Sequence, residues 1–335
     1  MYSAYKRIAH LVVAVSLLVS GSLGLAACGG APSKPAASAA QPAASGAAAR
    51  EPVSLATRYP LRVVDDLGRS VLIERAPRRV VSLGPSNTQI LFAVGAGRRV
   101  VGVDKFSTEP AAAQSLPKVG GLTDPDFEAI VARRPDLVLT TDINAQQVVQ
   151  RLDSLHIPVL VLNPKNLEDV HRGIRLVGRV LDLQAGAAAV VRSMEAKERQ
   201  VEARVADIPA SQRVKVYYEV WDNPEMTAGP GSFIDDLIRR AGGVNVADDA
   251  TSPWPNYSVE KIVAHDPDVI LTPFASGYQQ LLHGQRPAWN SIRAVRRHRV
   301  YLVPQNLVSE PGPDLVQALE LIARDLYPER FAAGR

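Results

Sequence analysis

The stretch Asp126-Phe-Glu-Ala-Ile-Val-Ala-Arg-Arg-Pro-Asp-Leu-Val-Leu-Thr140 recurs 132 residues later as Ser258-Val-Glu-Lys-Ile-Val-Ala-His-Asp-Pro-Asp-Val-Ile-Leu-Thr272. Counted from Glu128, 8 of 13 aligned positions are identical in the two copies. A repeat at this wide spacing predicts two similar lobes, because the repeats of a solenoid recur every 20–50 residues or so.

Each copy predicts a short helix that leads into a buried strand. The side-chain oxygens of Asp126 and Ser258 can accept a hydrogen bond from the first turn of such a helix. Pro135 and Pro267 then end the helix. The apolar run after each proline is typical of a parallel strand covered on both faces.

The equivalent carboxylates Glu128 and Glu260 are predicted to point at solvent. They lie about 100° around the helix from its apolar face. That face is predicted to hold Phe127, Ile130 and Val131 in the first copy and Val259, Ile262 and Val263 in the second. The two glutamates could simply stabilise a helix N-terminus, by about 0.3–1 kcal/mol each, or they could form a two-part docking surface.

The N-terminal residues are predicted to be a targeting segment rather than part of the fold. Residues 1–27 combine a basic start with a short apolar run, as secretory signals do. Leu25-Ala-Ala-Cys28 resembles a bacterial lipobox, which implies acylation of Cys28, the only cysteine in the chain. Residues 28–57 are rich in Ala, Pro and Ser and are predicted to be a flexible tether.

The remaining sequence predicts an α/β protein with parallel sheets, because strands and helices alternate along it. Residues 58–182 are expected to form an N-terminal lobe that starts with a hairpin over 61–73. Residues 183–207 are expected to be one linking helix, and 208–335 a C-terminal lobe. Net charge is +4, but charges of both signs are interspersed, so no nucleic-acid-binding tract is predicted.

The chain resembles the substrate-binding proteins of ABC importers for ferric siderophores, haem and cobalamin, the class III periplasmic binding proteins. The resemblance runs from about residue 58 to 331. It rests on the order of several segments: Asp65-Asp-Leu-Gly68, Arg79-Val-Val-Ser-Leu83, Leu91-Phe-Ala-Val-Gly-Ala-Gly97, Pro135-Asp-Leu-Val-Leu139, Trp289, Arg299-Val-Tyr301, Gly312-Pro313 and Leu326-Tyr-Pro-Glu-Arg330.

This resemblance implies two Rossmann-like lobes joined by a single long helix, with a ligand held between them. It places Glu128 and Glu260 at positions that pair with arginines of a membrane permease. The implied partners are that permease, its ATPase and a metal-chelate ligand, with the chain a monomer anchored outside the cytoplasm through Cys28. The single-helix link should allow only a modest change in lobe angle.

Candidate ligand-binding residues come from loops at the carboxyl ends of strands. They are Asn87, Phe106, Thr141, Trp221, Trp254, Phe274, Asn306 and Glu310. The aromatic side chains among them could stack on a flat chelate or pack in the core. Pro253-Trp254-Pro255 resembles an element of the enteric cobalamin binder, and Asp314 replaces an arginine common in the family, which argues against an anionic catecholate.

Other functions are less well supported by the sequence. It holds no dinucleotide, Walker A or nucleophile-elbow motif, and its six histidines form no short cluster. Neither an enzyme, a bound cofactor nor a bare metal site is therefore predicted. A haem receptor, with Tyr257 or Tyr278 as iron ligand, and a two-lobed surface adhesin remain alternatives.

Overall fold

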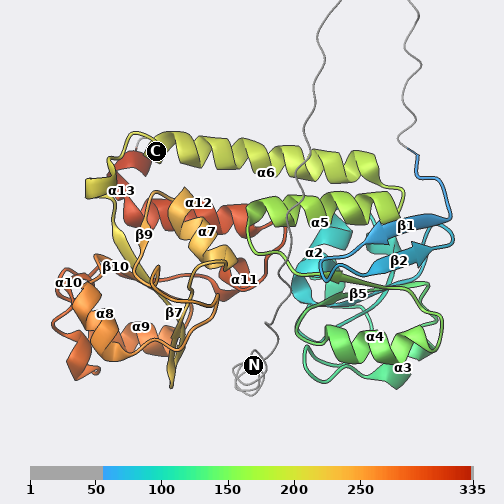
Figure 1. Ribbon diagram of the computed structural model, residues 1–335, viewed down its shortest axis with the longest axis horizontal. Helices are drawn as coiled ribbons and strands as arrows, with labels where there is room; N and C mark the ends of the chain where they lie inside the picture. Colours follow the sequence, from blue (N-terminus) through green and yellow to red (C-terminus); the bar gives the residue numbers. More distant parts are fainter. Residues whose placement is uncertain (1–55, 333–335) are drawn as a thin grey trace, which may run out of the picture. The chain divides into compact units, whose positions relative to one another are not determined.

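A computed structural model describes residues 56–332 of the chain (Figure 1). They belong to one compact unit, Ala56–Arg335. The predicted signal peptide, Cys28 and nearly all of the predicted tether lie outside the described residues. Within residues 56–332, no helix combines the length and the apolar character that crossing a membrane requires.

Two separate sheets define the two lobes and confirm the predicted fold class. The N-terminal sheet has the order β4-β3-β5-β6 and is parallel throughout. The C-terminal sheet has the order β11-β10-β7-β8, with β9 also paired to β7, and only β8 is antiparallel. The strands are β3 (Val80–Leu83), β4 (Val100–Val103), β5 (Leu137–Thr141), β6 (Val159–Leu162), β7 (Lys215–Asp222), β8 (Glu225–Thr227), β9 (Val244–Asn245), β10 (Val269–Thr272) and β11 (Val300–Leu302).

Helices flank both sheets, and a hairpin opens the described chain. Strands β1 (Leu61–Val64) and β2 (Ser70–Ile73) pair antiparallel, which confirms the hairpin predicted over 61–73. The helices are α2 (Pro85–Ala93), α3 (Phe127–Ala132), α4 (Ala145–Asp153), α5 (Leu167–Val180), α6 (Gln184–Val205), α7 (Phe233–Arg240), α8 (Val259–His265), α9 (Ala275–Leu282), α10 (Arg293–Arg296), α11 (Gln305–Val308), α12 (Leu315–Leu326) and α13 (Pro328–Phe331).

The sequence repeat is also a structural repeat. Helices α3 and α8 are its two copies, and both predicted caps form: Asp126 accepts from the third helical N–H, and Ser258 does the same. Arg134 and Asp266, which are equivalent, both have left-handed φ angles, of 48° and 46°, just before the proline.

The next equivalent pair repeats a contact between neighbouring strands. Asp136 accepts hydrogen bonds from the backbone N–H groups of Arg78 and Arg79, just before β3. Asp268 accepts one from Lys215 N at the start of β7. Each carboxylate therefore ties its own strand to the neighbouring strand of the same sheet, so the repeat preserves a tertiary contact as well as a sequence pattern.

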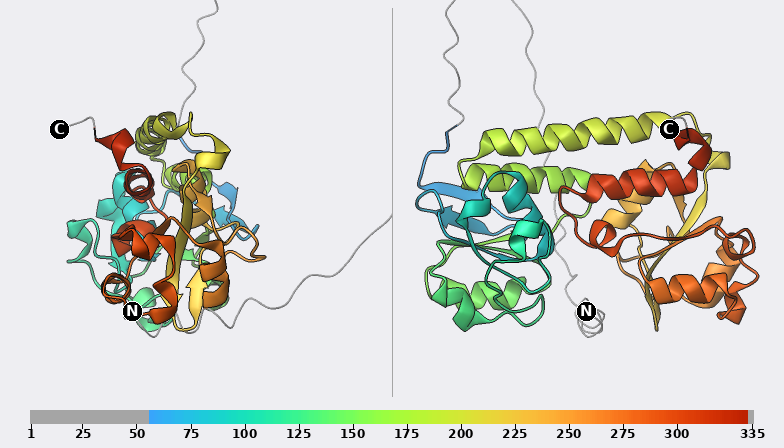
Figure 2. Two further views of the ribbon diagram at one scale, coloured as in Figure 1. Left: turned by 90° about the vertical axis from the view of Figure 1, so that its left-hand side faces the viewer. Right: turned by 180° about the vertical axis from the view of Figure 1, so that it is seen from behind.

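Helix α6 joins the lobes, and its bounds lie within two residues of the predicted 183–207. Its 22 residues span about 33 Å. It packs along α5 of the first lobe and α12 of the second (Figure 2). The crossing with α5 is close, because a Cβ placed on Gly178 would lie 2.4 Å from the Cβ of Ala187. Only glycine permits this approach at position 178.

Two local predictions were wrong. Asn87 was expected in a strand-end loop, but α2 starts at Pro85, since proline fits the first helical position, and Asn87 therefore lies inside the helix. Val131 is 39% exposed although it was assigned to the apolar face.

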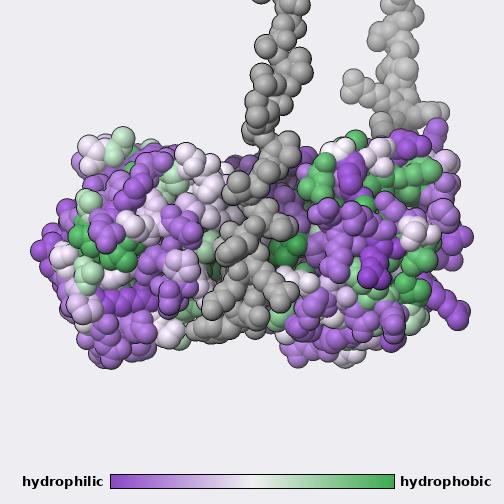
Figure 3. Space-filling model, turned by 60° about the horizontal axis from the view of Figure 1, so that its bottom comes forward, coloured by the Kyte–Doolittle hydropathy of each residue, from purple (hydrophilic) through white to green (hydrophobic). Residues whose placement is uncertain are grey.

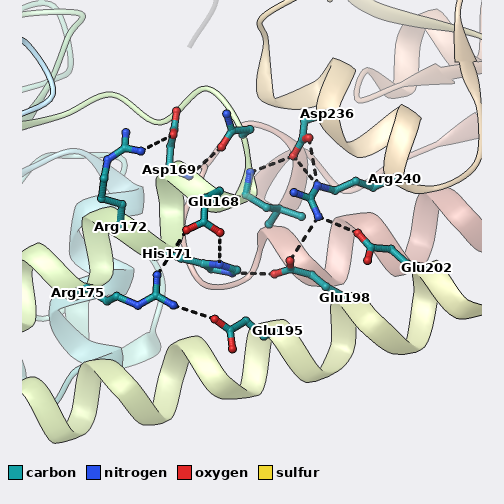
Figure 4. Close-up of polar contacts among 12 residues, drawn as sticks. Glu168, Asp169, His171, Arg172, Arg175, Glu195, Glu198, Glu202, Asp236 and Arg240 are labelled. Carbon is teal, nitrogen blue, oxygen red and sulfur yellow. Dashed lines mark hydrogen bonds and ion pairs between the residues drawn. The ribbon is translucent and has the colours of Figure 1, made fainter. Parts of the chain in front are cut away.

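A buried polar network ties α5, α6 and α7 together where the lobes meet (Figure 4). His171 Nε2 lies 2.7 Å from Glu198 Oε1, and the second Glu198 oxygen lies 3.7 Å from the Arg240 guanidinium. Arg240 also contacts Asp236, whose carboxylate accepts a hydrogen bond from Leu167 N of the first lobe. The network therefore runs from the first lobe, through the linking helix, to the second lobe.

This network predicts a pH-dependent stability. Burial alone would lower the pKa of His171, but the hydrogen bond and the charge of Glu198 outweigh it and raise that pKa above its ordinary value. The stabilisation is complete below pH 6.5 and is lost as the pH rises through the raised pKa. We expect His171→Leu to lower the free energy of unfolding by about 2 kcal/mol at pH 6, and by clearly less at pH 9, in urea titrations.

The exposed His283 provides the matched control. His283→Leu should change stability little at either pH. An equal loss for His171→Leu at pH 6 and pH 9 would show that His171 is neutral throughout and would contradict this account.

Candidate functional site

Polar side chains of the first lobe gather where β3 and β5 end. Asn87, on the first turns of α2, is 1% exposed. A Cβ on Gly84 would lie 2.8 Å from Thr141 Cγ2 and 3.5 Å from Asn87 Nδ2, so these two side chains flank the same glycine. Neither Asn87 Nδ2 nor Thr141 Oγ1 has a hydrogen-bond partner among the described residues.

The loop after β4 supplies the aromatic residue predicted for this lobe. Phe106 is half-buried, and Lys105 Nζ lies 5.3 Å from the centre of its ring. Beneath it, Asp104 accepts from Phe106 N at 2.8 Å and from the Ser107 hydroxyl at 2.5 Å. Burial raises the pKa of Asp104, and the hydrogen bonds from Ser107 and Phe106 partly offset that rise.

The second lobe places aromatic residues at the matching strand ends. Trp221, near the end of β7, and Phe274, just after β10, meet edge to face with ring centres 5.8 Å apart. Trp254 is half-buried and packs on Phe233 at 5.5 Å. Trp289 is 3% exposed and packs on the buried Tyr217, so it belongs to the core.

A charged cluster adjoins the ends of β7 and β10. Arg286 contacts the fully buried Glu219 and lies 3.7 Å from Glu225 and 3.6 Å from Asp222. The second Glu219 oxygen accepts from the Thr272 hydroxyl at 2.5 Å. Burial, followed by the charge of Glu219, raises the pKa of Glu225 to about 8. The cluster therefore carries more carboxyl groups than its single arginine can neutralise.

One predicted residue connects the two lobes. Glu310 Oε2 accepts a hydrogen bond of 2.6 Å from Gln89 Nε2 on α2. Gly312 lies against the same helix, since a Cβ there would be 2.7 Å from Gln89 Oε1. Asn306, in contrast, is exposed on α11. Glu310 therefore contacts the first lobe directly, whereas ligand binding by Asn306 stays a prediction.

Residues relevant to this site that the sequence analysis missed are Gln89, Asn144, Glu225 and Arg286. Asn144 follows Thr141 closely after β5, so the strand-end rule that selected Thr141 would also have found it. Arg286 lies 67 residues from Glu219, and no local pattern signals their pairing. Tyr257 is a poor haem ligand because its hydroxyl already bonds Val246 O and Asp249 Oδ1.

The two repeated glutamates are on the short helices that precede β5 and β10. Glu128 and Glu260 are exposed, in the first turns of α3 and α8. Hydrogen bonds from its own backbone N–H and from the Ser258 hydroxyl lower the pKa of Glu260, so it stays ionised. Within residues 56–332, no group of three or more His, Cys, Asp or Glu side chains is arranged to hold a metal ion.

The contact between Glu310 and Gln89 predicts a second pH effect. Burial, followed by the charges of Asp104 and Asp314, raises the pKa of Glu310 to about 7. Because the folded-state pKa exceeds the ordinary value, this carboxyl destabilises the fold increasingly as the pH rises from about 4.5 through 7. Allowing for partial exposure, we expect Glu310→Gln to raise the free energy of unfolding by about 1–2 kcal/mol at pH 8 and little at pH 5.

The matched control is Glu329→Gln, which changes an exposed carboxylate of the same lobe. It should leave the urea midpoint unchanged at both pH values. If Glu310→Gln proves destabilising at pH 8, the ionised carboxylate holds the lobes together and the sign of the prediction is wrong.

Comparison with known proteins agrees with this architecture. Residues 80–307 match the family described as Periplasmic binding protein. An uncharacterized ABC transporter substrate-binding lipoprotein of Bacillus subtilis is 30% identical, over 82% of this chain and 87% of its own length. A cobalamin-binding protein of Halobacterium salinarum is 32% identical, over 81% and 75% respectively.

A solved structure shows the same fold. The periplasmic heme-binding protein of Pseudomonas aeruginosa superposes with a TM-score of 0.68 at 26% identity, over 75% of this chain and 93% of its own. The two-lobed fold, the family match and these relatives agree on a solute receptor rather than an enzyme. The chain belongs to the periplasmic binding protein family and is the substrate-binding component of an ABC importer.

Proposed function

We propose that this chain is a lipid-anchored receptor that captures a cobalamin-type or iron-siderophore chelate between its lobes and delivers it to a permease. The observation that carries the proposal is the placement of aromatic and unpartnered polar side chains at the carboxyl ends of strands in both lobes. Phe274 and Trp254 are half-buried and offer ring surface, whereas Trp221 is 9% exposed and packs behind Phe274. Asn87 and Thr141 offer unused hydrogen-bonding atoms. A flat chelate with a polar edge matches both.

The charges around the lobe contact favour a neutral or cationic chelate. Burial raises the pKa of Glu310, and the nearby charges of Asp104, Asp314 and Glu109 raise it further. An anionic ligand placed against this group would be repelled. The proposal therefore favours a corrinoid or a cationic ferric complex over a catecholate siderophore, and it agrees with the cobalamin-binding relative.

Two alternative functions remain, and a specific experiment tests each of them. A haem receptor of the same family is favoured by the Pseudomonas structure, but it needs an iron ligand, for which Tyr278 is the remaining tyrosine candidate. An adhesin without a transport role needs neither a ligand nor Glu128 and Glu260. Ligand titration tests the first alternative, and uptake by glutamate variants tests the second.

We further propose that residues 1–27 are a signal peptide and that acylated Cys28 anchors the chain outside the cytoplasm through the tether 28–57. The lipoprotein named among the relatives supports this anchor. Residues 58–182 and 208–335 would then form the two lobes around the linking segment 183–207, in a chain that acts as a monomer.

Docking to the permease is proposed to use Glu128 and Glu260. Both helices that carry them lie on the side of the molecule away from α6 (Figure 1). On the visible surface of that side, polar residues cover most of each lobe (Figure 3). Apolar residues form small groups within this polar surface. Arginine–carboxylate pairs suit such a surface, because they fix orientation and speed encounter more than they raise affinity.

We expect a titration of intrinsic tryptophan fluorescence to identify the ligand. The full chain carrying Cys28→Ser would be titrated with cyanocobalamin, haem and a cationic and an anionic ferric siderophore. Saturable quenching by cyanocobalamin is the expected result, and Trp254→Ala should weaken it at least tenfold by removing a stacking surface.

The control for this titration is Trp289→Phe, which changes a tryptophan of the core. It should leave affinity unchanged. Quenching by haem alone would replace the corrinoid proposal with the haem alternative, and silence across the whole panel would refute both.

For docking, we expect Glu128→Ala combined with Glu260→Ala to reduce ligand uptake in cells by tenfold or more. Ligand affinity of the purified double variant should stay unchanged, because both side chains are exposed and make no contact with the proposed ligand-binding residues. The matched control is Glu74→Ala combined with Glu329→Ala, which removes one exposed carboxylate from each lobe. Normal uptake by the Glu128/Glu260 variant would favour the adhesin.

A further inference from the structure

Several buried polar side-chain atoms of the first lobe lack a hydrogen-bond partner. Of the eight such side-chain atoms among residues 56–332, four belong to Asn87, Gln89, Thr141 and Asn144. Folded proteins satisfy nearly all buried polar groups, since an orphaned one keeps its desolvation cost without a bond in return. Asn87 and Thr141 are the two that the structure places side by side, and this pair requires an explanation.

The backbone brings these groups together. Leu83 of β3 pairs with Thr140 of β5, so the segments that follow the two strands are neighbours. The side chains of Asn87 and Thr141 both approach Gly84, whose missing side chain leaves the room between them. Each strand thus delivers one unpartnered polar group to the same edge of the sheet.

The amide of Asn144 is held with its donor free. The Thr140 hydroxyl donates to Asn144 Oδ1, which occupies the acceptor end of the amide. The Nδ2 end, buried and without a partner, remains able to donate. Asn144 precedes α4, but its side chain makes no capping hydrogen bond there. Because Thr140 and Thr141 are successive residues of β5 and point to opposite faces of the sheet, Asn144 is a separate unpartnered group from Asn87 and Thr141.

A small hollow opens beside Asn87 and reaches the second lobe. Its walls include Ser86, Asn87, Leu162 and Gly173 of the first lobe and Pro311 of the second. The hollow therefore lies at the contact between the lobes, on the side where Gln89 bonds Glu310. The hollow shows that Asn87 lies beside the boundary between the lobes.

The residues around the hollow beside Asn87 are mainly neutral or acidic. No lysine or arginine lines the hollow, whereas Asp66 and Asp169 do, and Arg172 pairs with both of them at its rim. Gln89 holds the carboxylate of Glu310 nearby. A carboxylate or phosphate on the ligand would meet these negative groups without a cationic partner. A neutral oxygen acceptor meets the donors without that repulsion.

We infer that Asn87 Nδ2 and Thr141 Oγ1 form a neutral donor subsite for carboxamide oxygens on the edge of the bound ligand. The inference rests on the proposed function and adds the chemistry of the group that the first lobe recognises.

Such a subsite discriminates strongly. A site built to hydrogen-bond a substrate group rejects an analogue that lacks it, because its own buried groups are then left unpaired. Hydrolysing one edge carboxamide to a carboxylate also brings a charge into acidic surroundings. The subsite thus selects chelates with a neutral amide edge over those with an acidic edge.

The test uses the full chain carrying Cys28→Ser with cyanocobalamin, whose corrin edge carries carboxamides, and with its monocarboxylic acid derivatives. We expect at least one derivative to bind tenfold or more weakly than cyanocobalamin at pH 7.5. Thr141→Val and Asn87→Leu, which keep side-chain size, should each weaken cyanocobalamin binding about tenfold. In Thr141→Val, the ratio between the affinities for cyanocobalamin and for the monocarboxylic acid derivative should also decrease.

The melting temperature of the ligand-free protein separates a binding role from a structural one. A ligand-binding role predicts that Thr141→Val leaves the melting temperature unchanged or raises it, because the orphaned hydroxyl is removed. The control Thr251→Val, at an exposed threonine, should change neither the melting temperature nor the affinity for cyanocobalamin.

The possible results are distinguishable. A lower melting temperature with unchanged affinity in Thr141→Val and Asn87→Leu would show a structural role and overturn the inference. Tight binding of cyanocobalamin with equal affinity in wild type and both variants would overturn the inference and leave the proposed function standing. No binding of any chelate by the wild type would overturn both.

Discussion

One apolar core along the linking helix is the constraint on which the rest of the structure depends. Val191, Met194, Val201 and Val205 of α6 are each at most 4% exposed and belong to a single cluster with residues of both lobes. Burying a side chain of this size stabilises a protein by about 1.5–3 kcal/mol. Separating either lobe from α6 would expose several such side chains at once, so the lobes keep nearly fixed positions along the helix.

The polar groups beside this core have a different role. A buried charge stabilises little by itself, but losing its partner is costly, so the pairs mainly select one arrangement of the packed helices. Glu198 meets His171 on one side and Arg240 on the other, and only one rotation of α6 satisfies both. The apolar core holds α6 against both lobes, and the polar network fixes its rotation relative to them.

The sequence predicted the local elements well because their causes are local. The caps at Asp126 and Ser258, the prolines after α3 and α8 and the apolar strand runs each need only a few neighbouring residues, and α6 shows as a long stretch without proline. Contacts such as Glu310 with Gln89, 221 residues apart, depend on how the lobes pack and leave no local pattern. Asn87 shows the same limit, since it was placed near a strand end but outside the helix that in fact buries it.

The way polar groups are satisfied differs between the two sides of the first lobe, and this difference bears on how the protein works. Next to α6, the carboxylates of Glu198 and Asp236 each have a partner from another helix, so these charges are paired without a ligand. At the strand ends, Asn87 and Thr141 keep atoms without partners. Because the core along α6 limits how far the lobes can move, closing alone cannot bring a protein group to each of these atoms. The missing bonds are best supplied by a ligand, whose binding free energy can then favour a slightly closed form without a large change in the spacing of Glu128 and Glu260.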